Sequence, residues 1–342
     1  MGKISQPFTV PFLYLGYGIN YLSLSIKKFF MEYPDSSIAF EMINKYYTYN
    51  NDEAYDSKAT IVMFDGRLKH GGLNERLKGI MVSYYLSKKN KRRFYINWVE
   101  PFNLEDYLMP NKIDWRIDPN NIHYNRQNCF PVIMRSNVRQ LKIKNIIERL
   151  IFKSWFKRKK ELHVYSNLNM YRKSFNSIFN ELFKPSPILE KELQKYAGYG
   201  KYWSFSFRFK NLLGDFNEFE KEELDDESKS RLIRKNIDEF IRVKDLVPNN
   251  YRIFISSDSE TFLKEIRDVD ERIFVSEGRP IYTDTKDKDE QSFNSHLKTF
   301  VDFYLIMGAE KICIFLTGDM HNSGYTCLAS QIAQKKRVKH YF

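Results

Sequence analysis

The fold is decided by the stretch Phe64-Asp65-Gly66-Arg67-Leu68-Lys69-His70-Gly71-Gly72-Leu73-Asn74-Glu75-Arg76-Leu77-Lys78-Gly79-Ile80. It follows a β-rich run at 60–64, and its two adjacent glycines allow a sharp turn that leaves bare N–H groups at the start of a helix. Apolar residues then recur at a spacing of three or four, which predicts a helix that packs on the strand: Leu73, Leu77, Ile80, Met81 and Tyr84. This arrangement favours an anion or sugar site in an open α/β sheet, although an ordinary tight βα turn gives the same pattern.

Two later segments also place reactive side chains at strand ends. The run Tyr202–Phe207 predicts a buried strand that ends at Arg208, whose planar guanidinium can donate two parallel hydrogen bonds to a phosphate. A strand at Ile312–Phe315 runs into Thr317–Thr326, where small and hydroxyl residues precede a helical stretch. Such a switch from strand to helix suits diphosphate binding.

In this order and at these separations, the three segments resemble the fucosyltransferases that share the GT-B fold, including α-1,2, α-1,6, nodulation and protein O-fucosyltransferases. Residues 71–76 resemble the family's Gly-Gly-Leu turn, and Ser206-Phe207-Arg208 resembles its His-x-Arg strand end, whose arginine contacts the donor β-phosphate. Ser256-Ser257-Asp258 resembles the family's strand-end Thr/Ser-Asp segment. Ser323-Gly324-Tyr325-Thr326 resembles the turn that holds the donor diphosphate.

The sequence departs from this pattern at two positions. Ser206 replaces the family's histidine, and Phe209 replaces the usual second arginine. These changes leave recognition of the base and the identity of the donor open. The first 58 residues match no part of the pattern.

The resemblance implies an α/β, GT-B-like protein in which two Rossmann-like domains with mainly parallel sheets face a central cleft. We expect an N-terminal extension at 1–58, an acceptor domain at 59–198 and a nucleotide-sugar-binding domain at 199–342, because Gly198 and Gly200 follow a proline-rich break and a short helix. The alternation of patterns predicts strands at 60–64, 94–98, 162–165, 202–207, 252–255, 272–275 and 311–315. It predicts helices at 73–87, 136–152, 171–182, 188–196, 227–243, 261–268 and 293–307.

Glycosyl transfer needs a cation to neutralise the leaving diphosphate and a base to deprotonate the acceptor hydroxyl. No Asp-x-Asp pair follows a predicted strand convincingly and the acidic run 218–226 reads as a solvated loop, so we expect no metal and assign the cationic role to Arg208 with the helix after Ser323. A structural ion pair is the alternative for Arg208. Asp215 is the first candidate for the base, and Glu75 and His70 are its rivals.

Two carboxylates are candidates for reading guanine, because a carboxylate can accept hydrogen bonds from N1 and N2 of that base. They are Asp258 and Asp302; the latter lies in an apolar helix pattern, so a buried, satisfied carboxylate is an equal alternative. The complete set of predicted binding residues is Gly71, Gly72, Asn74, His70, Ser206, Asp258, Asp302, Ser323, Gly324, Tyr325 and Thr326.

Charge and composition limit the class of protein and its partners. The 342 residues contain 28 Phe and 23 Tyr, which indicates a folded protein rather than a disordered one. The net charge of +12 is concentrated in two basic runs, 88–93 and 153–160, of which the second is interleaved with aromatics. These runs suit an anionic membrane surface, nucleic acid, or two solvated helix ends, and nucleic acid is the least favoured. Residues 8–30 are apolar but interrupted, which favours a peripheral membrane contact.

Three cysteines without a metal-ligand spacing, and the lack of a recognisable signal peptide, favour the cytoplasm, with peripheral attachment to the inner face of the membrane. The sequence therefore predicts a metal-independent inverting glycosyltransferase that moves fucose from GDP-fucose to a glycan or lipid-linked glycan in bacterial surface-glycan synthesis, without a cofactor. The alternatives are the same fold with another nucleotide sugar, or a non-enzymatic basic protein that binds membranes or nucleic acid.

Overall fold

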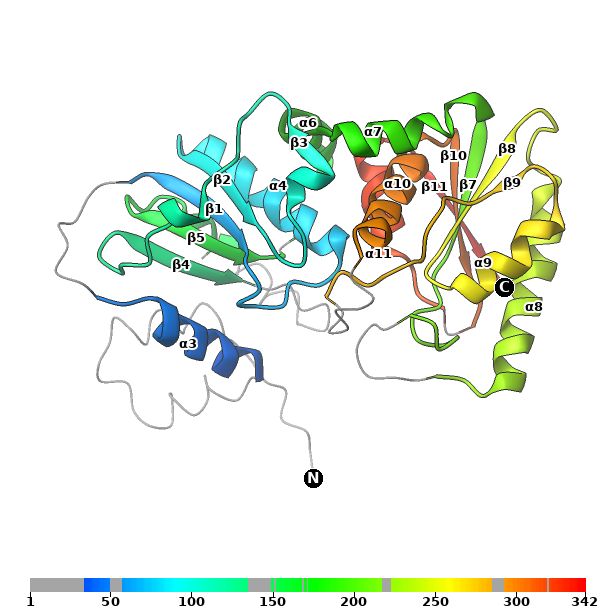
Figure 1. Cartoon of the computed structure of the whole chain (residues 1–342), viewed down its shortest axis with the longest axis horizontal. Coiled ribbons are helices and arrows are strands. Elements are labelled where there is room, and N and C mark those ends of the chain that lie inside the picture. The colour runs from blue at the N-terminus through cyan, green and yellow to red at the C-terminus, as the bar shows by residue number, and fades with distance from the viewer. Residues whose placement is uncertain are drawn as a thin grey trace. The chain divides into compact units, whose positions relative to one another are not determined.

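The structure is a computed structural model that describes residues 34–49, 57–134, 149–150, 152–167, 169–170, 172–216, 223–284, 292–318 and 320–342. The chain divides into two compact units (Figure 1). The first unit comprises residues 1–71, 75–100 and 113–171, and the second comprises 72–74, 101–112 and 172–342. The apolar stretch 8–30 and most of the helix predicted at 136–152 and of the acidic run predicted at 218–226 lie outside the described residues.

The first unit contains a four-stranded parallel sheet in the order β2-β1-β5-β4. Its strands are β1 (Ala59–Phe64), β2 (Arg93–Trp98), β4 (Cys129–Met134) and β5 (Glu161–Ser166). All six residues of β1 are buried, as expected for a central strand of a parallel sheet that is covered on both faces. The helix predicted after the glycine turn is present as α4 (Leu73–Lys89).

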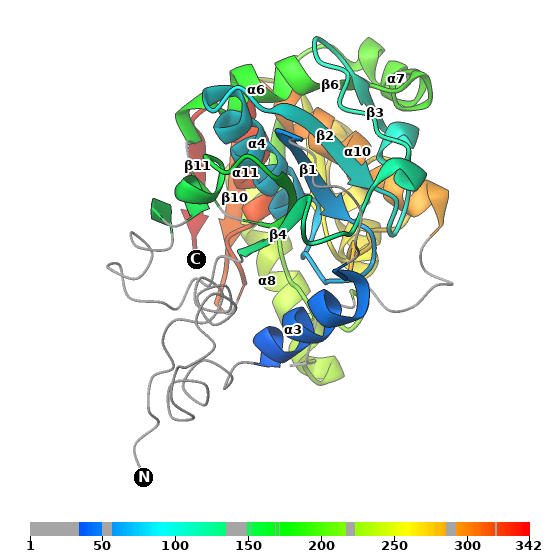
Figure 2. The same cartoon turned by 90° about the vertical axis from the view of Figure 1, so that its left-hand side faces the viewer.

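Alternate residues of β1 face different helices. Ile61 and Met63 pack with α3 (Pro34–Tyr46) through Met42 and Ile43. The other face of the sheet carries Phe94, whose ring contacts that of Tyr84 in α4, with ring centroids 5.0 Å apart. Figure 2 shows α3 and α4 on opposite sides of the sheet.

The second unit contains a five-stranded parallel sheet in the order β11-β10-β7-β8-β9. Its strands are β7 (Tyr202–Phe207), β8 (Arg252–Ser257), β9 (Ile273–Phe274), β10 (Lys311–Leu316) and β11 (Arg337–Tyr341). On one face, α8 (Asp226–Lys244) and α9 (Glu260–Ile266) bury apolar residues such as Phe240 and Phe262 against Phe205 and Phe207. The helices α10 (Phe293–Gly308) and α11 (Gly324–Ile332) pack against each other on the other face (Figure 1).

Four short elements ahead of this sheet also belong to the second unit. The strands β3 (Leu108–Pro110) and β6 (Phe183–Pro185) pair antiparallel, and the helices α6 (Phe175–Leu182) and α7 (Pro187–Gln194) follow the first unit. Because α6 packs on α11 and α7 packs on α10, the chain enters the second unit for the last time at Arg172. This last crossing lies earlier in the chain than the boundary between 198 and 199 that we expected from the sequence.

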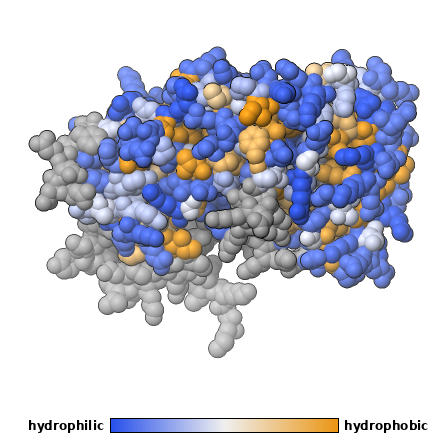
Figure 3. Space-filling model, viewed as in Figure 1, coloured by the Kyte–Doolittle hydropathy of each residue, from blue (hydrophilic) through white to orange (hydrophobic). Residues whose placement is uncertain are grey.

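All seven strands predicted from the sequence are present, and their bounds differ from the prediction by two residues at most. Four strands and one helix were not predicted: β3, β4, β6, β11 and α3. Most of the surface in Figure 3 is hydrophilic, and its hydrophobic side chains lie in several separate places, as is ordinary for a folded protein.

Gly79 is the point of closest approach between α4 and β5. A Cβ atom at this position would lie 1.8 Å from the carbonyl oxygen of Ser166, which is a backbone atom that cannot turn aside. Gly79→Ala should therefore push α4 away from the sheet and cost about 1–3 kcal/mol of unfolding free energy, measured by urea denaturation.

The matched control for this prediction is Gly198→Ala. A Cβ at Gly198 meets no described atom within 4 Å, so this change should leave the unfolding free energy equal or slightly higher. Equal stability of the two variants would contradict the close packing of α4.

Candidate functional site

A chain of buried hydroxyl groups crosses the carboxyl end of the second sheet. The Ser206 Oγ atom at the end of β7 lies 2.8 Å from Ser256 Oγ at the end of β8. Thr326 in α11 donates from Oγ1 to Ser206 Oγ at 3.0 Å, and its Oγ1 also lies 3.1 Å from Ser323 Oγ. The end of β7, the end of β8 and the start of α11 are thus joined by side chains that are short enough to let these elements approach closely.

Ser323 is the N-cap of α11, because its hydroxyl accepts a hydrogen bond from the backbone N–H of Thr326 at 3.2 Å. The next residue, Gly324, lies against Asn74, whose Nδ2 atom would be 3.0 Å from a Cβ at that position. Asn74 belongs to the second unit together with Gly72 and Leu73. The glycine turn therefore brings one predicted binding residue to the start of the helix predicted to hold the diphosphate.

Arg208 is held at this edge by Asp258. The Arg208 Nη1 atom lies 3.0 Å from Asp258 Oδ2. The same carboxylate accepts hydrogen bonds from the backbone N–H groups of Phe209 at 2.8 Å and Lys210 at 2.7 Å, so it fixes the start of the loop after β7. The guanidinium also lies over the ring of Phe216, 4.7 Å from its centroid. Burial raises the pKa of Asp258, and the charge of Arg208 acts in the opposite direction.

Asp215, the first candidate for the base, has one carboxylate oxygen that accepts hydrogen bonds from other residues of the chain. Its Oδ2 atom accepts hydrogen bonds from Ser259 Oγ at 2.8 Å and from Thr261 N at 2.9 Å, which ties it to the N-terminus of α9. Its Oδ1 atom is buried and has no hydrogen-bond partner among the residues that the structure describes. Asp215 lines a small pocket together with Phe216, Arg279, Pro280, Ile281, Tyr282 and Ser295.

Asp302 lies in a buried ion pair. Lys298 Nζ is 3.2 Å from Asp302 Oδ2, and the side chain of Lys298 is 1% exposed. Ser276 donates its hydroxyl to Asp302 Oδ1, and Lys298 Nζ lies 2.6 Å from Ser276 Oγ. Burial raises the pKa of Asp302, and the nearby ammonium opposes that shift. The satisfied carboxylate that the sequence left open as an alternative is what the structure shows.

Tyr325 is turned away from the row of hydroxyls. Its hydroxyl donates to the backbone carbonyl of Thr299, and its ring lies 5.2 Å from that of Phe303, so this residue joins α11 to α10. Burial raises its pKa well above the ordinary range.

The remaining candidates belong to the first unit. Gly71 has a φ of 87°, a conformation that favours glycine, and its carbonyl accepts a hydrogen bond from Arg76 Nε at 3.1 Å. His70 is buried beside Phe64, with ring centroids 4.6 Å apart. Glu75 lies 3.9 Å from Lys78 and is about one-third exposed.

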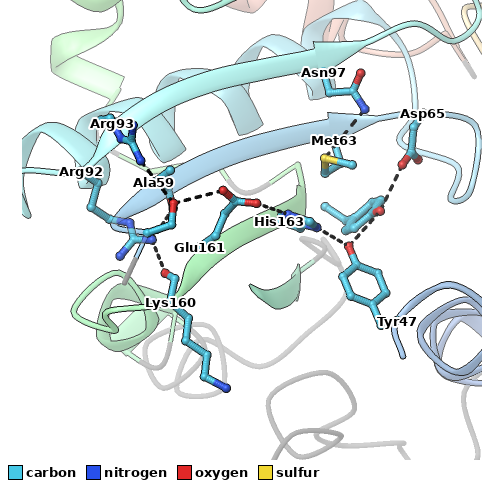
Figure 4. A network of polar contacts seen from close by, with 12 residues as sticks. Tyr47, Ala59, Met63, Asp65, Arg92, Arg93, Asn97, Lys160, Glu161 and His163 are labelled. Carbon is cyan, nitrogen blue, oxygen red and sulfur yellow. Dashed lines mark hydrogen bonds and ion pairs between the residues drawn. The ribbon is translucent and has the colours of Figure 1, made fainter. Parts of the chain in front are cut away.

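The structure also contains a buried polar network that the sequence reading missed (Figure 4). The Tyr47 hydroxyl lies 2.9 Å from His163 Nδ1, and His163 Nε2 lies 2.8 Å from Glu161 Oε1. The Tyr47 hydroxyl also lies 3.3 Å from that of Tyr165, which donates to Asp65 at 3.2 Å. The alternation of β5 was a signal, because Glu161 and His163 point to the same face of a buried strand.

Among the described residues, no group of three or more His, Cys, Asp or Glu side chains is placed to hold a metal ion. In the same residues, no helix is both long and apolar enough to cross a membrane.

Each unit contains a parallel sheet with helices packed on it, which is an α/β architecture, and solved fucosyltransferase structures have a similar fold. The chain is similar to the NodZ α-1,6-fucosyltransferase soaked with GDP-fucose, at 12% identity and a TM-score of 0.53 over 81% of this chain and 93% of that one. It is also similar to a mutant of Arabidopsis thaliana FUT1 in complex with GDP, at 9% identity and a TM-score of 0.53 over 90% and 74% of the two chains. NodZ from Bradyrhizobium matches at 11% identity and a TM-score of 0.51 over 80% and 93%.

No protein-family model matches the sequence, and no curated protein does. The structural likeness confirms the predicted fold class.

Asp258→Asn tests the anchoring of Arg208. The substitution removes the charge that faces Arg208 and turns an amide N–H₂ toward a group that donates, so it should cost about 1.5–3 kcal/mol of unfolding free energy in urea. Asp226→Asn is the control, because that side chain is fully exposed and should change stability by less than about 0.5 kcal/mol. Similar values for the two variants would show that Asp258 does not hold the loop.

Proposed function

We propose that the chain is a metal-independent, inverting glycosyltransferase that transfers fucose from GDP-fucose to a glycan acceptor. One observation carries this proposal. Arg208, anchored by Asp258, lies at the carboxyl end of the second sheet, where the row of hydroxyls meets the start of α11. The fold likeness to proteins whose structures contain GDP or GDP-fucose supports the choice of donor.

Arg208 and α11 would together neutralise the leaving diphosphate. A guanidinium held on one side by a carboxylate has a fixed orientation, so it loses little freedom when it meets a phosphate. The N-terminus of a helix adds a partial positive charge and backbone N–H donors. At the carboxyl end of the sheet, this combination supplies the positive charge that other transferases obtain from a metal ion.

The base must accept a proton from the acceptor hydroxyl, and Asp215 remains the first candidate. Its Oδ2 atom is held by Ser259 and the N-terminus of α9, whereas the buried Oδ1 atom makes no hydrogen bond to a described residue, so Oδ1 is the oxygen left to accept a proton. Glu75 and His70 remain the rivals from the first unit.

Asp258 and Asp302 both stay candidates for the recognition of guanine, although each already has protein partners and Asp302 is also held by Lys298 in a buried ion pair. Asp258 already accepts from two backbone N–H groups and faces Arg208. Asp302 receives a side-chain hydroxyl, that of Ser276, which a base N–H could replace by a change of rotamer.

The proposed acceptor is a glycan or lipid-linked glycan of bacterial surface-glycan synthesis, and the proposed location is the cytoplasm, with peripheral attachment to the inner face of the membrane. The basis for the acceptor is the composition, which is rich in Lys, Asn, Ile, Tyr and Phe, and the basis for the location is the small number of cysteines and the basic runs 88–93 and 153–160. The alternative within the same fold is another nucleotide sugar as donor.

Arg208→Lys should lower turnover of GDP-fucose strongly, by about 2.7–4 kcal/mol of transition-state stabilisation, because lysine keeps the charge and loses the planar fork. Turnover is measured with EDTA present, since the proposal needs no metal. Arg252→Lys is the matched control, because Arg252 lies at the opposite end of the same sheet. Near-normal turnover of Arg208→Lys would remove Arg208 from the mechanism, and wild-type turnover abolished by EDTA would contradict the metal-free mechanism.

GDP should bind more tightly than UDP or CDP in titration calorimetry, because a carboxylate at the base site accepts from both N1 and N2 of guanine. Asp302→Asn should reduce this preference, since an amide presents one acceptor instead of two. Tighter binding of UDP than GDP would overturn the choice of donor while leaving the fold assignment intact.

A further inference from the structure

The two basic runs of the sequence meet at one edge of the first sheet. Arg92, at the start of β2, is buried and donates from Nη1 to the Arg158 carbonyl at 2.5 Å and from Nη2 to the Lys160 carbonyl at 2.7 Å, just before β5. It also donates to the carbonyl of Ala59 at the start of β1. The guanidinium of Arg92 therefore joins the amino ends of three strands. Figure 4 shows Arg92 together with Arg93 and Lys160 at these strand ends.

This convergence gathers exposed basic residues near the amino ends of β1, β2 and β5, and we call this set of residues the basic edge. Nine exposed cationic residues form it: Lys58, Lys88, Lys89, Lys91, Arg93, Lys157, Arg158, Lys159 and Lys160. In the segments 57–60, 84–95 and 152–162 the single carboxylate is that of Glu161, which is buried and paired with His163. These three segments therefore carry a large excess of positive charge.

The aromatic side chains of the second basic run do not reach this surface. Phe152, Trp155 and Phe156 are all buried, so the interleaving seen in the sequence is an inward apolar face and an outward basic one. Single-stranded nucleic acid is bound by exposed aromatics on which bases stack, and these segments offer none.

The residue types of the basic edge also favour binding to a surface with spread negative charge over specific binding to individual phosphate groups. Seven of the nine cations are lysines, which act as compact point charges, whereas nucleic-acid recognition favours the planar fork of arginine. Of the two arginines, Arg158 lies over the ring of Phe130, 4.2 Å from its centroid. Leu150, three residues before Lys153 in the sequence, is 58% exposed and adds an apolar side chain to the surface of this segment.

We propose that the basic edge docks the protein on a membrane surface of anionic phospholipid. Each lysine near such a surface contributes to binding through the negative potential of the headgroups. The Gly71 turn follows the carboxyl end of β1, and the basic edge lies at the amino end of the same strand, so docking leaves that turn exposed to its substrate. The proposal names the surface behind the peripheral location and does not depend on the transfer reaction.

Sedimentation of the full chain with vesicles tests this surface. Vesicles of phosphatidylcholine with phosphatidylglycerol should bind the protein, vesicles of phosphatidylcholine alone should not, and added salt should release it. Replacement of Lys157, Lys159 and Lys160 by serine should lower the partition coefficient by at least about tenfold, and replacement of Lys88, Lys89 and Lys91 should do the same.

The control replaces three exposed lysines of the second unit by serine: Lys191, Lys235 and Lys264. It removes the same charge and should bind anionic vesicles as the wild type does. All three variants should retain the melting temperature and the GDP affinity of the wild type, so a failure of the proposed activity is distinguishable from a failure of docking. Equal vesicle binding by all variants, binding to neutral vesicles, or tighter binding to single-stranded DNA or RNA than to anionic vesicles would overturn the proposal.

Discussion

The candidate site depends on one buried carboxylate. Asp258, at the end of β8, holds the guanidinium of Arg208 and the first two N–H groups of the loop after β7. A buried charge is stable only when it is paired and hydrogen-bonded. Removal of one partner would therefore leave the remaining buried groups without a counter-charge or a hydrogen bond. The same interaction therefore orients a cation and shapes the loop that leads to Asp215. This coupling explains why the guanidinium of Arg208 has a fixed orientation at the carboxyl end of β7, even though the segment that follows is a loop.

The hydroxyl row explains how the site can depart from the fucosyltransferase pattern at Ser206. A histidine at that position would have to fit between the ends of β7 and β8 and the first turn of α11, where Ser206 now meets both Ser256 and Thr326. Three short hydroxyls satisfy one another there without a charged or aromatic ring. Ser206 thus links the ends of β7 and β8 to the first turn of α11. The second departure, Phe209, is also buried, and its ring centroid lies 4.9 Å from that of Phe262.

Local patterns predicted the parallel strands, because a run of β-branched and aromatic residues bounded by glycine or charge is a strong signal. The same reasoning placed Arg208 after a strand, a helix after Ser323, and a glycine turn between a strand and a helix. It missed β11, whose residues Arg337–Tyr341 are polar and half-exposed because the strand lies at the edge of the sheet. It assigned Asp258 to a ligand, since nothing in the sequence shows that residues 48 to 50 positions away would use its oxygens. The burial of Phe152, Trp155 and Phe156 was also hidden, because sequence alternation alone does not tell which face of a helix meets a core.

The path of the chain has a consequence for how this protein could have arisen and how it can be divided. Neither unit is a continuous segment: the chain passes from the first to the second at 72–74, at 101–112 and finally at 172. A fragment that begins at residue 199 would lack α6 and α7, and it would leave bare the sides of α11 and α10 on which those helices pack. The two sheets are therefore not interchangeable modules joined by a linker. An exchange of one sheet for that of a relative, whether in evolution or in the laboratory, must carry these interwoven segments with it.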